Sequence, residues 1–80
     1  MNRIMCELLG VSQHKRKSDS SLYYSASILI EKRVVTLFYN DEELFKNLSK
    51  LDRLCDICLL GEFKIRDEHT FIFIPQSFEM

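Results

Sequence analysis

The sequence predicts a mainly β protein whose sheet curls toward a barrel and carries one short helix. Residues 54–66 alternate apolar and polar side chains, which is the period of a long, half-buried strand. Gly61 falls on the apolar side of this pattern, so we expect a bend or bulge within one strand rather than a turn between two. A strand of this length in a chain of 80 residues indicates a coiled sheet or barrel.

Composition indicates one domain over residues 1–80, near the lower size limit for a chain that folds on a single core. Apolar residues at 46% and charged residues at 29% are ordinary for a globular protein. No apolar run approaches the roughly 20 residues that span a bilayer, and no signal-peptide core is recognisable. We therefore expect a cytoplasmic protein.

Charge is distributed unevenly along the chain. The net charge of −1 argues against a protein that binds nucleic acid over its whole surface. Residues 1–39 nevertheless carry six Lys or Arg against three Asp or Glu, whereas residues 40–80 carry five against nine. The first half of the chain is thus the part expected to attract an anion.

Three cysteines are an odd number, which does not fit a fully paired disulfide framework. Cys55 and Cys58 form a C-x-x-C motif, but no second ligand pair accompanies it, and His14 and His69 are far apart in sequence. The motif also lies in a strand pattern, whereas a redox motif opens a helix. We expect ordinary thiols, with no metal and no cofactor.

The first half of the chain predicts three strands. Residues 3–11 form the first, bent near Gly10, and residues 12–21 are predicted to be a polar loop. The second strand, residues 22–30, has a core face and an opposite face that begins with Tyr23 and continues with serines. Residues 31–33 form a charged turn before a third strand at 34–39. The expected core face of the second strand consists of Leu22, Tyr24, Ala26, Ile28 and Ile30.

An amphipathic helix is predicted over residues 41–51, with a stripe of leucines on one side. Asn40 or Asp41 is expected to cap it, and Glu43 lies three residues after Asn40, as in a capping box. After the long fourth strand, residues 67–69 form a hairpin loop. Residues 70–74 form a fifth strand, which Pro75 is expected to end.

The resulting order, β-β-β-α-β-β, is that of the OB-fold, a five-stranded barrel with its helix between the third and fourth strands, although other folds share it. Two passages, HKRKSDSSLYYSASI and LDRLCDICLLGEFKIRDEHTFIFIP, carry a further likeness. The chain resembles small OB-fold single-stranded-DNA-binding (helix-destabilising) proteins of bacteriophages and mobile elements. The resemblance implies a protein that coats DNA during replication, with a homodimer among its implications.

Binding to single strands needs cations for the phosphates and exposed aromatic rings for the bases. Considered alone, the basic run is typical of a solvated loop, and strand aromatics such as Phe71 and Phe73 are typical of a core. Their convergence on one surface favours binding. The expected contacts are Lys15, Arg16 and Lys17 from the loop, Tyr23 for stacking, Lys32 and Arg33 along the backbone, and Tyr39 or Phe38 as a second ring.

Other functions stay open at this point. RNA is an alternative ligand for the same surface. A small protein-interaction module, such as a phage-type inhibitor or assembly subunit, is the alternative from another class, acting through its acidic helix region or an exposed strand edge. We do not expect an enzyme, because two glycines allow no glycine-rich phosphate loop and residues 67–69 look like a solvated turn.

Overall fold

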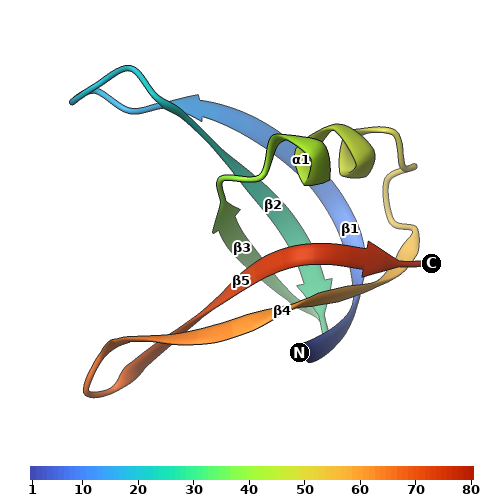
Figure 1. The fold of residues 1–80 in the computed structure, drawn as a ribbon. Helices are drawn as coiled ribbons and strands as arrows, with labels where there is room; N and C mark the ends of the chain where they lie inside the picture. Colours follow the sequence, from blue (N-terminus) through green and yellow to red (C-terminus); the bar gives the residue numbers. More distant parts are fainter.

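The computed structural model describes residues 1–80 and contains five strands and one helix (Figure 1). The element order expected from the sequence is confirmed. No helix has the length and apolar character needed to cross a bilayer. The elements are β1 (Asn2–Lys15), β2 (Leu22–Ile30), β3 (Arg33–Tyr39), α1 (Glu42–Ser49), β4 (Asp56–Asp67) and β5 (Thr70–Glu79).

All five strands belong to one antiparallel sheet with the order β3-β2-β1-β4-β5. The sheet is strongly curved, so its two end strands, β3 and β5, come near each other (Figure 1). They are not joined by a hydrogen-bonded ladder. The mainly β architecture is therefore confirmed, while the sheet curls without closing into a barrel.

The core lies inside the curl. Residues on the inner face of every strand contribute to it, and α1 adds Leu44 and Leu48 against β1 and β2. Cys55, outside the strands, packs against this cluster as a small apolar residue. The buried cluster consists of Cys6, Leu8, Tyr24, Ala26, Ile28, Leu37, Tyr39, Leu44, Leu48, Ile57, Leu59 and Phe73.

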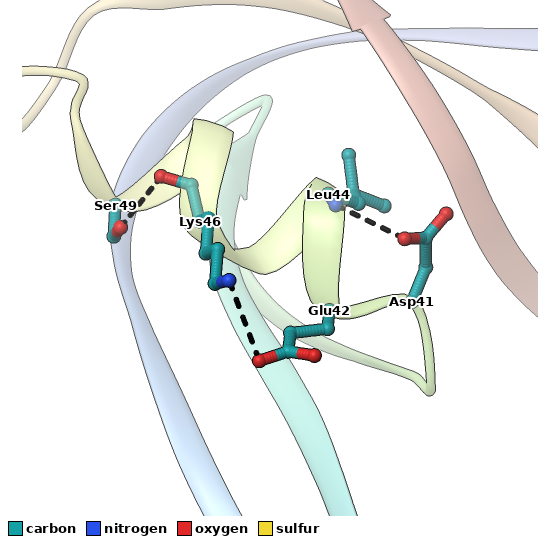
Figure 2. Close-up of polar contacts among 5 residues, drawn as sticks. All are labelled: Asp41, Glu42, Leu44, Lys46 and Ser49. Carbon is teal, nitrogen blue, oxygen red and sulfur yellow. Dashed lines mark hydrogen bonds and ion pairs between the residues drawn. The ribbon is translucent and has the colours of Figure 1, made fainter.

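Side chains at both ends fix the limits of α1 (Figure 2). Asp41 is the N-cap, and its Oδ1 accepts a hydrogen bond from the backbone N–H of Leu44 at 3.2 Å. The alternative capping box between Asn40 and Glu43 is not formed. Lys46 Nζ lies 3.6 Å from the carboxylate of Glu42, one turn earlier. The backbone carbonyl of Lys46 accepts a hydrogen bond from the Ser49 hydroxyl at 2.7 Å.

Gly61 lies at a register shift between β4 and β5, so the predicted bulge within one strand is confirmed. A Cβ at this position would overlap the carbonyl oxygen of Ile74 and lie 2.9 Å from Pro75 Cα. Pro75 sits opposite Gly61, and β5 continues past it to Glu79. The expected end of the strand at Pro75 is wrong, because β5 is an edge strand and a bulge tolerates a residue without an N–H.

Two hairpins extend beyond the core as arms (Figure 1). β1 runs to Lys15, where a loop had been predicted from residue 12, and His14 pairs with Tyr23 of β2. In the other arm, formed by β4 and β5, Phe63 and Phe71 are exposed although both were expected to face the core. Phe73 is buried as expected.

Candidate nucleic-acid interface

Tyr23 lies on the outer face of the sheet, where the β1–β2 arm leaves the core. Its half-buried ring stacks on the His14 ring at a centroid distance of 4.9 Å and an interplanar angle of 22°. Phe38 of β3 completes the group with its ring 6.2 Å from that of Tyr23. We call His14, Tyr23 and Phe38 the aromatic patch.

His14 is fixed in this patch by a hydrogen bond, since its Nε2 lies 2.8 Å from the hydroxyl of Ser25. Ser25 is buried, so this contact anchors the imidazole to the sheet. Phe38 is the most open ring of the three, with 52% of its surface exposed. Phe38 is therefore the free ring of the patch, whereas the Tyr23 ring is already stacked on His14.

Basic side chains border the aromatic patch. Lys15, Arg16 and Lys17 are all exposed. The Arg16 guanidinium lies 5.1 Å from the Tyr23 ring centroid, at the distance of a cation–π contact. The same guanidinium donates to Asn40 Oδ1 at 3.1 Å, so Arg16 links the β1–β2 loop to the segment before α1.

The loop that carries Arg16 and Lys17, residues 16–21, is held by its own hydrogen bonds. The Arg16 N–H donates to the Ser21 carbonyl at 2.8 Å, and the Ser20 N–H donates back to the Arg16 carbonyl at 3.1 Å. Asp19 accepts from the backbone N–H and the hydroxyl of Ser21. These bonds, led by the backbone one, lower the pKa of the Asp19 carboxyl, which keeps it charged and the turn closed.

Cations and rings meet in a single shallow depression on this surface. Three cationic side chains line it and no carboxylate does, so an anion meets favourable charge from one side. Flat groups can lie against the rings at the same time. The lining residues are Lys15, Arg16, Lys17, Ser18, Tyr23 and Phe38.

Lys32 and Arg33 do not share this surface, although they were expected to. They flank the β2–β3 turn at the opposite end of β2 from Tyr23. Ile30 lies seven positions after Tyr23 along β2, which is roughly 23 Å at the usual rise per residue. Lys32 and Arg33 therefore lie far from the candidate site.

Tyr39 is also in a different place from the one expected, since its ring is buried in the core. It pairs with Tyr24 across the β2–β3 hairpin, so both rings point to the inner face. Burial raises the pKa of the Tyr39 hydroxyl to about 12, with smaller contributions from Tyr24 and Asp41. Of the two rings considered for β3, Phe38 is the outward one.

Sequence reasoning missed the part played by His14 and Asn40. The first was assigned to the cationic run and the second to helix capping. Strand alternation carried out to Lys15 would have placed His14 beside Tyr23, whereas the Arg16–Asn40 contact joins residues 24 positions apart and leaves no local signal.

The cysteines lie away from this surface and are free thiols. Burial raises the pKa of Cys6 to about 11, with Cys58 and Cys55 adding smaller effects. No group of three or more His, Cys, Asp or Glu side chains is arranged to hold a metal ion. No protein-family model, curated protein or solved structure matches the chain.

Proposed function

We propose that this protein binds single-stranded DNA, with little sequence preference, through the aromatic patch and the basic β1–β2 loop. The supporting observation is the depression in which three cations and two aromatic rings meet without a carboxylate. Cations neutralise phosphates, and each base stacked on an aromatic ring contributes about 1–3 kcal/mol whatever its identity. Catalysis is not part of the proposal.

The neighbouring contacts suggest an order of events. Phe38 offers a ring that a base can reach directly, whereas the Tyr23 ring is in contact with both the His14 ring and the Arg16 guanidinium. A phosphate would draw Arg16 away from Asn40, because a charge-assisted pair is stronger than a bond to a neutral amide. Tyr23 would then be freed for a second base.

The fold supports the same proposal. We infer an OB-fold-type sheet from the strand order, the helix between β3 and β4, and the nearness of β3 and β5. In that fold, oligonucleotides bind on the face of strands 2 and 3 and on the loops that follow strands 1 and 4. Tyr23 and Phe38 lie on strands 2 and 3, and Arg16 and Lys17 lie in the first of those loops.

Fluorescence anisotropy with a labelled oligo-dT tests the charge contribution. We expect micromolar or tighter binding at low salt, with an affinity that falls as salt rises. Changing Lys15, Arg16 and Lys17 to Ala should flatten the log–log salt dependence by about two units, at roughly 0.7 per phosphate contact on a single strand.

The matched control is Lys32→Ala with Arg33→Ala, which removes charge at the far end of β2 and should leave the slope unchanged. An unchanged anisotropy with wild-type protein at low salt would rule the function out. A parallel titration with oligo-U measures whether RNA occupies the same surface.

Binding to another protein is a second candidate function, favoured by the exposed apolar side chains of the β4–β5 arm. On this alternative, the immobilised chain retains a stoichiometric partner from nuclease-treated lysate. Ile65→Lys should abolish that capture, whereas loss of the basic loop should not.

A further inference from the structure

The cations of the candidate site gather at one point of the sheet surface. Lys15, Arg16 and Lys17 are consecutive in sequence and line one depression, which we call the basic depression. Lys32 and Arg33 lie at the other end of β2. Proteins that follow a single strand of DNA have cations along the whole path of its backbone, because every nucleotide carries a phosphate. Here the positive charge is concentrated instead of spread along a path.

Beyond the aromatic patch, the outer face of the sheet is neutral. The next two residues on this face of β2 are Ser25 and Ser27. Ser25 pairs with Ser12 of β1. Ser27 pairs with Gly10 of β1 and with Thr36 of β3. A phosphate that lay over this part of the sheet would meet no side chain of opposite charge.

Two carboxylates lie opposite each other further along the same face. Glu7 of β1 pairs with Leu29 of β2 on one side and with Asp56 of β4 on the other. Both sequence neighbours of Glu7 belong to the core cluster, so its own side chain points outward. Leu29 is six positions after Tyr23, which is roughly 20 Å along β2. A strand of DNA that followed the sheet away from the basic depression would therefore run toward negative charge.

Two other directions from the basic depression offer little charge to a phosphate chain. Toward α1, the segment that Arg16 contacts leads directly into three acidic residues, 41–43. Between β3 and β5 lies a hollow of about 470 Å³, in which ten of twelve lining residues are hydrophobic, Phe38 and Phe63 among them. Arg66 is the one charged residue of that hollow. Strong attraction for phosphate is thus confined to the basic depression.

We propose that the basic depression holds the phosphorylated end of a DNA single strand, with the terminal base stacked on Phe38. This inference rests on the proposed function and names the part of the strand that the site takes. Because cations are gathered at one point, the part of the strand with the highest charge is attracted most strongly there. The rest of the strand leaves the surface into solvent.

A terminal phosphate fits this site in charge and in hydrogen bonding. A phosphate monoester carries about −1.5 to −2 charge at pH 7, whereas each phosphate inside a strand carries about −1. The terminal phosphate and the next one together balance Lys15, Arg16 and Lys17. Three oxygens of the monoester accept hydrogen bonds, and the Arg16 guanidinium can hold two of them at once. Phe38 is 52% exposed, so its ring is open to the base beside that phosphate.

Competition anisotropy with the full chain tests the proposal. Unlabelled dT strands of about 30 nucleotides, longer than the 4–16 nucleotides that one such domain covers, displace a short labelled dT strand with a 5′-phosphate. Four competitors are compared: linear with a 5′-phosphate, linear with a 3′-phosphate, linear without a terminal phosphate, and a closed circle without ends. One of the phosphorylated strands should compete about tenfold better than the unphosphorylated strand and the circle, and it identifies which end is bound.

Variants on the two sides of the charge pattern test its cause. Lys17→Ala should reduce the preference for the phosphorylated end to about threefold, whereas Lys32→Ala, the matched control at the far end of β2, should keep it at about tenfold. Glu7→Gln with Asp56→Asn removes the opposed carboxylates and should improve competition by the circle about threefold. Far-ultraviolet circular dichroism checks that each variant is folded.

Equal competition by the phosphorylated and unphosphorylated linear strands would overturn the inference and leave DNA binding intact. Competition by the circle that equals that of the phosphorylated strand would have the same meaning. Absence of binding to every strand, the labelled one included, would overturn the proposed function as well.

Discussion

Neighbouring tyrosines in this sheet have opposite surroundings. Successive side chains of a strand point to opposite faces, so Tyr23 faces outward and Tyr24 inward. Tyr24 stacks on Phe45 at 4.5 Å and helps to seat the helix, whereas Tyr23 stacks on His14 beside the basic loop. Tyr39 joins Tyr24 in the core, and its hydroxyl has no hydrogen-bond partner there.

The unpartnered hydroxyl gives a stability prediction. Burial of a polar group without a hydrogen bond costs about 1–3 kcal/mol, so Tyr39→Phe should increase the free energy of unfolding by about 1 kcal/mol. Urea unfolding at pH 7 measures the change. A decrease in stability would show that the hydroxyl has a partner after all.

The same variant has a pH signature. The pKa of Tyr39 rises from 10.0 to about 12 in the folded state. The contribution of this pKa shift to the free energy of unfolding is therefore complete below about pH 10 and is lost as pH rises toward 12. Tyr39→Phe should lose less stability over that window than wild type. The thiol of Cys6, with its pKa raised from 9.0 to about 11, adds an earlier loss in both proteins.

Alternation along β2 was enough to predict an outward Tyr23, but not to place Tyr39. Its position follows from the register of the β2–β3 hairpin, which a two-residue turn at Glu31 and Lys32 sets. Both residues have positive φ, 47° and 69°, a conformation that Asn and Gly favour. The sequence predicted a charged turn at residues 31–33, but because neither Asn nor Gly occurs there, the turn type and the register could not be predicted.

Among the elements, β4 and β5 depend on a close approach of their backbones at Gly61. The glycine lets the carbonyl of Ile74 and the ring of Phe73 occupy the space of a side chain. Sequence alternation predicted the bulge, because one face stays apolar across Gly61. It did not predict that β5 passes through Pro75, since proline ends most central strands and edge position is a tertiary property.

The two glycines form a matched pair for experiment. Gly61→Ala forces the backbones of β4 and β5 apart and should reduce the free energy of unfolding by about 3 kcal/mol. Gly10→Ala, where a Cβ meets nothing within 4 Å, should be neutral or stabilising by about 0.5 kcal/mol. Thermal and urea unfolding compare them, and equal effects would contradict the close approach at Gly61.

The polar end of β1 shows why the arms were hard to predict. In the β1–β2 arm, which extends past the core, residues 12–15 carry no apolar alternation. Residues 12–15 therefore looked like loop, although they pair with β2 up to Leu22. In the other arm the pattern was apolar, and core was the natural interpretation of Phe63 and Phe71.

At the scale of the whole molecule, the order of elements and the curled sheet followed from the sequence, because periodicity and helix caps are local. Whether the sheet closes is not local, since β3 and β5 meet only through the curvature of the strands between them. The exposed apolar face of the β4–β5 arm, with Phe63, Ile65 and Phe71, is a similar case. A strand with an exposed apolar face has the same two-residue period in sequence as a strand whose apolar face is buried in the core.

The central claim for the whole molecule is that bases stack on its outward aromatic rings. Phe38→Leu and Tyr23→Leu keep an apolar side chain but remove the ring. The matched control is Phe63→Leu, because Phe63 is 52% exposed like Phe38 and lines the same hollow, but lies outside the basic depression.

Affinity for oligo-dT, measured by anisotropy at one fixed salt concentration, compares the three variants. Loss of one stacked base should weaken binding by about tenfold for Phe38→Leu and Tyr23→Leu, and Phe63→Leu should stay within about twofold of wild type. Equal affinities for all three variants would contradict the account.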